Sequence, residues 1–186
     1  SDRLPWSTVL RDFNDAYGLD LDRDERVESQ LAQRESYIRS SYLGVPEDLS
    51  RDVRALAERI TAGCSSDRER KEAISRYLQE NYRYTLNPEP TPDGRPFLEH
   101  LLFDAKEGYC TWFATAASIL GRLSGVPTRY VEGYRAEIPA GATITLDGNN
   151  AHAWCDAYIS GYGWVVVEAT PGFRSRPEPG PDYGIP

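Results

Sequence analysis

The residues of this sequence best suited to covalent chemistry are its three cysteines and two histidines. A cysteine attacks a carbonyl as the thiolate, and a helix N-terminus or a neighbouring imidazole favours that form. Cys110 follows Gly108 and Tyr109 and precedes an alanine-rich run, so we expect it in the first turn of a helix. The N–H groups of that turn would also bind the oxyanion formed on attack. Cys110 is therefore the candidate nucleophile.

A base and an orienting acid follow further along the chain. His152 lies 42 residues after Cys110 (152 minus 110), at the start of an expected strand. Glu168 follows the apolar run 164–167, where a carboxylate is costly to bury unless it is paired. The 16 residues between them (168 minus 152), with glycines at the intervening turn, suit two adjacent antiparallel strands. The sequence thus predicts a cysteine–histidine–acid triad, in which the carboxylate holds the imidazole.

The other cysteines and the second histidine favour structural roles. Cys155 lies in the middle of an expected strand, where a thiol facing the core is the simpler interpretation. Cys64 falls in a loop between helices, and His100 is interpreted as a partly exposed or capping residue. The cysteine spacing matches neither a disulfide framework nor a metal-binding pair. We therefore expect no cofactor and no metal.

Composition excludes some partners. The 21 basic and 29 acidic residues give a net charge of -8, which argues against nucleic acid because such binding requires a cationic surface. The longest apolar stretches, such as 114–120, are far shorter than the roughly 20 residues that cross a bilayer. We expect no membrane contact from this segment itself.

Helical signals precede strand signals, which indicates an α+β fold. Ser50 and Ser66 are the expected N-caps of two helices, the second with Glu69 completing a capping box. After the cysteine helix come three strand-like runs: Thr128 to Ala136, Ala151 to Ile159 and Gly163 to Ala169. We divide the chain into a partly helical N-terminal extension, a catalytic domain and a tail rich in proline and glycine: 1–48, 49–174 and 175–186.

Four ordered motifs give the chain a family resemblance, over about residues 45 to 173. They surround Cys110, Pro127, His152 and Glu168. With them the sequence resembles the bacterial transglutaminase-like domains. The resemblance implies a papain-like fold, in which a cysteine helix packs on an antiparallel sheet that bears the base and the acid. Most of that superfamily carries aspartate at the acid position, so Glu168 is a departure.

The resemblance also implies a function and a location. We expect a thiol-dependent amidase, protease or acyltransferase that acts on protein or peptide amides. The alternative is a catalytically silent binding or assembly domain. Similar bacterial proteins carry this domain outside the cytoplasmic membrane, tethered to transmembrane helices. Tyr84, Trp112 and Trp154 are candidates for substrate binding, and the first two also for an oxyanion donor.

Overall fold

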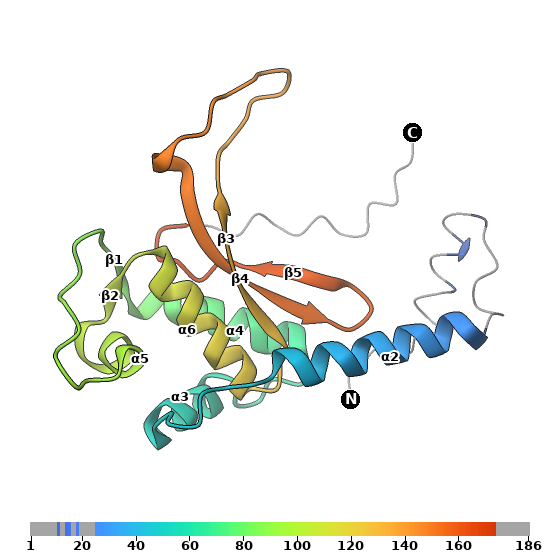
Figure 1. Cartoon of the computed structure of the whole chain (residues 1–186), viewed down its shortest axis with the longest axis horizontal. Coiled ribbons are helices and arrows are strands. Elements are labelled where there is room, and N and C mark those ends of the chain that lie inside the picture. The colour runs from blue at the N-terminus through green and yellow to red at the C-terminus, as the bar shows by residue number, and fades with distance from the viewer. Residues whose placement is uncertain (1–10, 12–13, 16–17, 19–24, 174–186) are drawn as a thin grey trace.

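Helices and a small antiparallel sheet make up the structure, which is a computed structural model describing residues 11, 14–15, 18 and 25–173 (Figure 1). The α+β prediction is confirmed. The main helices are α2 (Glu25–Tyr42), α3 (Arg51–Ile60), α4 (Asp67–Asn81) and α6 (Cys110–Leu123). Short helical turns are α5 (Phe97–Glu99), the π-helix η2 (His100–Ala105) and the 3-10 helix η3 (Gly148–Asn150). The strands are β1 (Arg83–Tyr84), β2 (Glu107–Gly108), β3 (Thr128–Tyr134), β4 (Ala151–Ile159) and β5 (Gly163–Val167).

The two N-caps expected for α3 and α4 are confirmed. The Ser50 hydroxyl accepts a hydrogen bond from the Val53 N–H, and the Ser66 hydroxyl accepts one from the Glu69 N–H. The predicted capping box needs correction, because the Glu69 carboxylate accepts at 2.7 Å from the N–H of Ser65, one residue before the N-cap Ser66. Donors that no helical carbonyl can reach are thus satisfied at both starts.

Strands β3, β4 and β5 form one antiparallel sheet in that order. Strand β4 has the predicted bounds, whereas β3 ends at Tyr134 and β5 at Val167, each two residues earlier than expected. Helix α6 packs against β4, and one face of this strand carries small buried side chains, among them Ala153, Cys155 and Ala157. The opposite face carries the alternate residues of the strand, such as Trp154.

Helix α6 can lie close to this sheet because its contact positions are small. A Cβ at Gly121 would stand only 2.6 Å from Cγ2 of Thr128. The predicted end of the helix is also confirmed: Gly125 adopts φ +79°, and the Val126 N–H returns to the Gly121 carbonyl at 2.9 Å.

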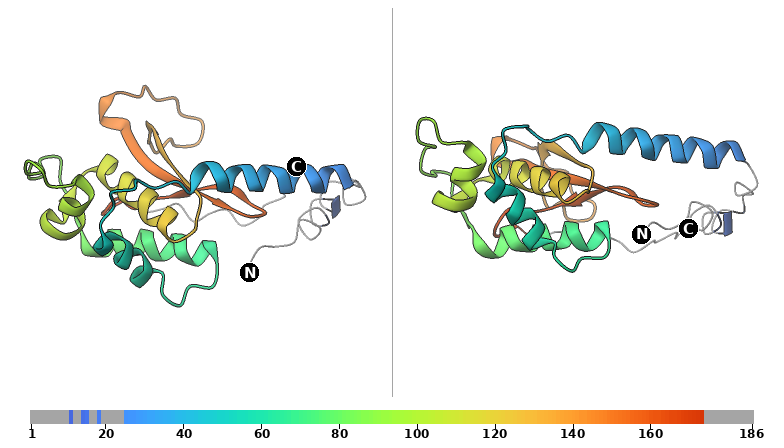
Figure 2. Two further views of the ribbon diagram at one scale, coloured as in Figure 1. Left: turned by 60° about the horizontal axis from the view of Figure 1, so that its bottom comes forward. Right: turned by 90° about the horizontal axis from the view of Figure 1, so that it is seen from below.

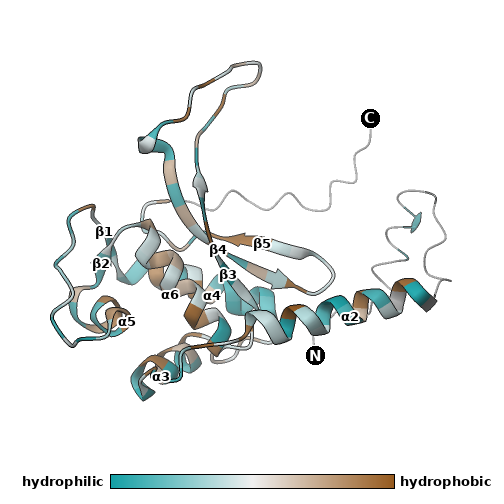
Figure 3. Ribbon diagram, in the orientation of Figure 1, coloured by the Kyte–Doolittle hydropathy of each residue, from teal (hydrophilic) through white to brown (hydrophobic). Residues whose placement is uncertain are grey.

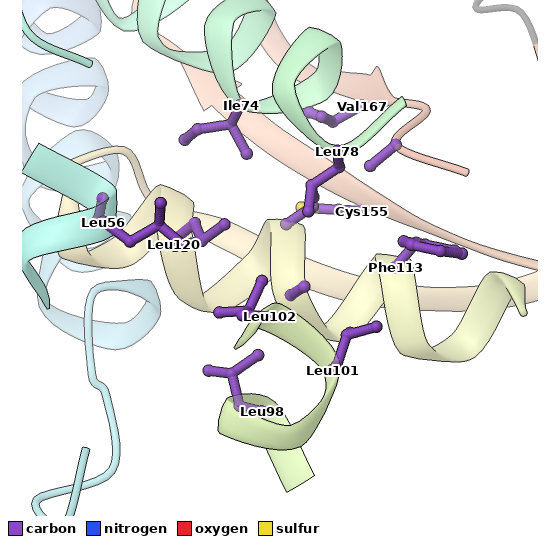
Figure 4. Close-up of a cluster of buried hydrophobic side chains, with 14 of the residues drawn as sticks. Leu56, Ile74, Leu78, Leu98, Leu101, Leu102, Phe113, Leu120, Cys155 and Val167 are labelled. Carbon is purple, nitrogen blue, oxygen red and sulfur yellow. The ribbon is translucent and has the colours of Figure 1, made fainter. Parts of the chain in front are cut away.

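The hydrophobic core lies where α3, α4, α6 and the sheet meet (Figure 4). Leu78 from α4, Phe113 from α6 and Cys155 from β4 belong to this cluster and are at most 1% exposed. Leu101 and Leu102 close it from η2. The core therefore holds α6, and with it Cys110, in a fixed position against the sheet.

Two segments extend away from this body. Helix α2 is largely hydrophilic (Figure 3) and projects beyond the sheet (Figure 2). Its C-terminal half is attached through buried Ile38, through an ion pair of Arg39 with Asp67 at 3.0 Å, and through Tyr42, whose ring lies 4.9 Å from Trp164. The connection 135–150 between β3 and β4 is a long hairpin that stands out from the molecule (Figure 1).

Several expectations need correction or stay open. His100 is 3% exposed, so of its two predicted roles the partly exposed one is wrong. The capping role is confirmed, because His100 is the C-cap residue of α5 and its N–H bonds the Phe97 carbonyl. Its Nε2 lies 3.3 Å from the carbonyl oxygen of Glu89 in the loop 87–96. The tail 175–186 lies outside the described residues. The division of the chain into three parts stays a prediction. In the described part of the chain, no helix has both the length and the apolar character needed to cross a bilayer.

Candidate active site

Cys110 is the first residue of α6, as predicted. Tyr109 precedes it in extended conformation, and its side chain makes no capping hydrogen bond. The Tyr109 carbonyl accepts from the N–H groups of Trp112 and Phe113. The N–H groups of Cys110 and Thr111 have no carbonyl within the helix to bond, so they are available to an anion. The Cys110 side chain is half-buried and its thiol is free.

The short β1–β2 pair directs the chain into this helix. The Arg83 N–H bonds the Lys106 carbonyl at 3.0 Å, and the Thr85 N–H bonds the Gly108 carbonyl at 2.8 Å. This pairing sets Tyr84 beside Gly108, two residues before Cys110. Burial raises the pKa of Tyr84, and the negative charge of the Cys110 thiolate raises it further. Tyr84 therefore stays a neutral hydroxyl close to Cys110.

Tyr130 of β3 is a second phenol whose pKa responds to the charge of Cys110. Burial raises the pKa of Tyr130, and its hydrogen bond to Glu132 at 2.5 Å and the charges of Glu132 and Cys110 act in the same direction. The single O–H of Tyr130 is donated to Glu132, so Tyr84 is the better candidate for a phenol donor near Cys110.

The structure joins the other two predicted site residues directly. Nε2 of His152 lies 2.7 Å from Oε2 of Glu168, and both side chains are 5–6% exposed. Oε1 of Glu168 accepts a second hydrogen bond, from the Thr170 N–H at 3.0 Å. Glu168 therefore holds one ring nitrogen of His152 and leaves Nδ1 for another partner. Among the described residues, the Cys110 sulfur makes no hydrogen bond to the His152 ring.

The ionisation of Glu168 follows from these contacts. Burial raises the pKa of Glu168 and is the largest single influence, but hydrogen bonds from His152 and Thr170 lower it. Together they outweigh burial, so the pKa of Glu168 lies below its usual value. The carboxylate is ionised at neutral pH and can stabilise an imidazolium.

Aromatic and cationic side chains surround the imidazole. The Phe173 ring is stacked on the His152 ring, with centroids 4.8 Å apart and planes 17° apart. Trp154 stacks less closely, at 6.3 Å. Arg135 places its Cζ 5.0 Å from the Phe173 ring centroid and a guanidinium nitrogen 3.7 Å from Oε2 of Glu168.

A pocket of about 420 Å³ opens beside this cluster. His152, Tyr84, Arg135 and Phe173 line it, together with both ends of the hairpin 135–150. Because Tyr84 lies both in the pocket and near Cys110, it connects the surroundings of His152 with those of the thiol.

The remaining sequence candidates lie in different places. Trp112 packs against Phe97 at 4.9 Å and against Tyr109 at 5.6 Å. The indole N–H of Trp154 donates to Asp156 at 3.0 Å.

Cys155 is fully buried, and burial raises its pKa to about 12, so the prediction of a core thiol is confirmed. Cys64 is half-buried between α3 and α4. No cluster of metal-ligating side chains occurs within the described residues.

Sequence reasoning missed three residues at this site: Gln79, Arg135 and Phe173. Gln79 gave no signal, because its contacts lie 89 and 94 residues along the chain. Arg135 is a cation near the end of the first predicted strand run, Thr128 to Ala136, which precedes the base. Phe173 follows Pro171 and Gly172, and the turn they make could have suggested that its ring folds back toward Glu168.

Comparison with known proteins gives a consistent result. The family model of the transglutaminase-like superfamily matches residues 54–169. "Uncharacterized protein YebA" of Bacillus subtilis is 31% identical over 163 residues, which is 83% of this chain and 22% of that protein. A protein-glutamine gamma-glutamyltransferase of Pseudomonas aeruginosa is 34% identical over 107 residues, 56% of this chain and 15% of that protein. The chain thus spans about a fifth or less of the curated relatives it matches.

The fold comparison agrees. The periplasmic domain of TgpA from Pseudomonas aeruginosa, in a crystal structure bound to ethylmercury, superposes with a TM-score of 0.59 and 28% identity. The match covers 72% of this chain and 49% of that domain. Since the family model covers more than half of the sequence and contains Cys110, His152 and Glu168, the chain belongs to the transglutaminase-like superfamily.

Proposed function

We propose that this protein is a thiol-dependent acyl-transfer enzyme acting on protein or peptide amides, with Cys110 as nucleophile, His152 as base and Glu168 as orienting acid. The observation that carries the proposal is the buried hydrogen bond of 2.7 Å between His152 and Glu168 at a pocket. A buried carboxylate–imidazole pair is costly unless it serves a purpose, and orienting a general base is the common one.

The course of α6 along β4 supports Cys110 as the third member. The Ser118 side chain lies beside the Cys155 sulfur, and three residues later Gly121 contacts Thr128, which pairs with Ala157. Helix and strand therefore run in the same direction.

The positions of Cys110 and His152 along the helix and the strand can be estimated from the contact between Ser118 and Cys155. Cys110 is eight residues before Ser118, or about 12 Å along a helix, and His152 is three residues before Cys155, or about 10 Å along a strand. The two candidates come to about the same level of the fold. Tyr84, which lines the pocket of His152 and lies near the Cys110 charge, supports the same conclusion.

The chemistry would proceed in two halves. The Cys110 thiolate attacks the amide carbon, and the oxyanion binds the N–H groups of the first turn of α6, with Tyr84 as a candidate side-chain donor. The C–N bond then breaks, the leaving nitrogen takes a proton from His152, and an amine departs. The resulting thioester is attacked by water or by a second amine, which gives its proton to the imidazole as the thiolate is released.

We favour hydrolysis over amine transfer. The pocket beside His152 is lined by polar groups, among them Arg135, Glu137 and Asn150, so water has access to the proposed base. The name of the Pseudomonas relative, a protein-glutamine gamma-glutamyltransferase, supports amine transfer instead. An assay with a glutamine-containing protein and a fluorescent primary amine separates the two: ammonia release without incorporation indicates hydrolysis, and incorporation indicates transfer.

We also propose an extracytoplasmic location. The structural relative TgpA is described as a periplasmic domain, and the chain matches only part of each longer relative. The chain would then be a domain of a larger envelope protein, anchored by segments outside this sequence.

The nucleophile can be tested without knowing the substrate. Iodoacetamide at pH 6 should label wild-type protein rapidly at one site, because an imidazole-paired thiolate persists in mild acid. Cys110→Ala should abolish this labelling, and His152→Ala should slow it, whereas Cys64→Ala should leave it unchanged. Ethylmercury is a second thiol probe, since a TgpA structure contains it.

Two results would contradict the proposal. Labelling carried by Cys64 would show that the nucleophile is misassigned. A Cys110 thiol that reacts no faster than an ordinary one would favour the catalytically silent binding or assembly domain.

A further inference from the structure

We propose that Gln79 and Phe173 are positioning residues for the His152–Glu168 pair. Gln79 fixes the backbone at both ends of the turn 168–173, and the Phe173 ring holds the flat side of the imidazole. This inference rests on the proposed function, because it takes His152 as the catalytic base and Glu168 as its orienting acid.

Gln79 is a half-buried residue of α4 whose side chain faces the turn. Its Nε2 donates to the Glu168 carbonyl at 2.7 Å and to the Phe173 carbonyl at 3.0 Å. A carboxamide nitrogen carries two hydrogens, so both are used. Ser75, one helical turn earlier, donates its hydroxyl to the same Glu168 carbonyl at 2.5 Å. The acid and the aromatic ring are therefore anchored by one helix, at the two ends of one turn.

The turn itself is built to return the chain over the imidazole. The Phe173 N–H bonds the Thr170 carbonyl at 3.1 Å, and Gly172 adopts φ +82°, a conformation that residues with a side chain rarely adopt. Within the same turn, the Thr170 N–H also donates a hydrogen bond to Oε1 of Glu168. As a result the carboxylate meets the edge of the His152 ring while Phe173 meets its face.

Phe173 also covers one face of His152 at the pocket that both residues line. It is half-buried, whereas His152 and Glu168 are 7% and 5% exposed. The Arg135 guanidinium lies over the Phe173 ring, and the centroid of the Tyr84 ring lies 5.5 Å from that of Phe173. Keeping water from a charge-assisted hydrogen bond strengthens it. The two charged groups near the imidazole are Glu168 and Arg135, and the position of each is fixed relative to the Phe173 ring.

The test compares the rate of Cys110 alkylation by iodoacetamide at two pH values. Phe173→Leu keeps an apolar side chain but loses the flat face, and Gln79→Leu removes both donors. Each should reduce the rate at pH 6 by about tenfold, as expected for a loosened catalytic group. At pH 9.5, where an unassisted thiol is ionised, the rate should change by less than about twofold. Phe173→Tyr, which retains the stacked ring, should retain the pH 6 rate.

Matched controls separate positioning from general destabilisation. Phe97→Leu removes a ring that contacts Trp112 instead of His152, and Gln33→Leu removes an exposed carboxamide of α2. Both should leave the ratio of the two rates unchanged. Circular dichroism checks that every variant is folded.

A second measurement does not depend on thiol reactivity. The chain has only two histidines, so the imidazole N–H protons can be assigned by NMR. The His152 Nε2 proton should exchange slowly with water in wild type and faster in Phe173→Leu and Gln79→Leu, with His100 as internal reference. If wild type lacks rapid labelling at pH 6, the proposed function fails. The exchange rate of the His152 Nε2 proton then still decides whether Gln79 and Phe173 position the His152–Glu168 pair. Unchanged exchange in both variants would overturn it.

Discussion

Glu168→Gln is the substitution that tests the site most directly. The two carboxylate oxygens of Glu168 accept from different donors, His152 Nε2 at 2.7 Å and the Thr170 N–H at 3.0 Å. Glutamine has one oxygen and one NH₂ group, so it can satisfy only one of these donors in the same geometry. If its oxygen keeps the Thr170 bond, its NH₂ faces Nε2 and forces the ring proton onto Nδ1. His152 would then be unable to accept the thiol proton there.

The loss of stability expected for Glu168→Gln can be estimated from the burial of the His152–Glu168 pair. The Glu168 side chain is 6% exposed, so water cannot replace the lost partner. A buried polar group left unsatisfied costs about 1–3 kcal/mol. For a domain of this size, each kcal/mol lowers Tm by about 2–4 °C, so the expected decrease is about 2–12 °C. The lower half of this range is favoured, because the variant also loses the cost of burying a charge.

The pH dependence adds a sign that can be checked. Since the pKa of Glu168 in the folded protein is lowered, its ionisation stabilises the fold above the usual value of about 4.3. That stability is lost as the pH falls through the folded pKa. The difference in Tm between wild type and Glu168→Gln should therefore be largest near pH 7 and shrink in acid.

Thermal unfolding followed by circular dichroism measures both effects, with alkylation at pH 6 as a functional readout. Glu80→Gln, on the exposed side of α4, is the matched control and should leave Tm and labelling unchanged. A Glu168→Gln protein with wild-type Tm at pH 7, the same pH profile and full labelling would refute this account of the site.

Three further predictions concern the fold that carries the site. Gly121→Ala should lower the free energy of unfolding by about 1–3 kcal/mol in urea titrations, because its Cβ would stand 2.6 Å from Cγ2 of Thr128; Gly148→Ala, with open space around it, should have no such effect. Arg39→Ala removes bonds to Glu35 and Asp67 and should cost about 2 kcal/mol, with faster proteolysis of α2. Because the pKa of Cys155 is raised to about 12, stability should fall as the pH rises above about 8.5, and Cys155→Ala should reduce that fall in urea titrations at pH 7 and 10.

Local signals made most of the fold predictable. Ser50 and Ser66 mark helix starts because their hydroxyls satisfy backbone donors within three residues. The bond between His152 and Glu168 was also within reach of sequence reasoning. Both residues lie on one hairpin, and a short turn leaves adjacent strands few alternative registers.

Contacts between distant segments were out of reach. The burial of His100 depends on η2 and on the loop 87–96 that covers it, and no periodic pattern in the sequence indicates a π-helix. The β1–β2 pair has two residues in each strand, too few for any alternation to show. Gln79 reads as an ordinary polar residue of α4, since only the folded chain brings it to Glu168.

The use of glutamate as the proposed orienting acid has a structural explanation. Glutamate is one methylene group longer than aspartate, so the site must accommodate the added length. Here Glu168 follows the last residue of β5, Val167, and lies at the start of the turn that Gln79 anchors. From that position the longer side chain spans two donors, the His152 ring and the Thr170 N–H two residues ahead. The added length thus couples the acid to the turn carrying Phe173, so that the carboxylate and the stacked ring are oriented together.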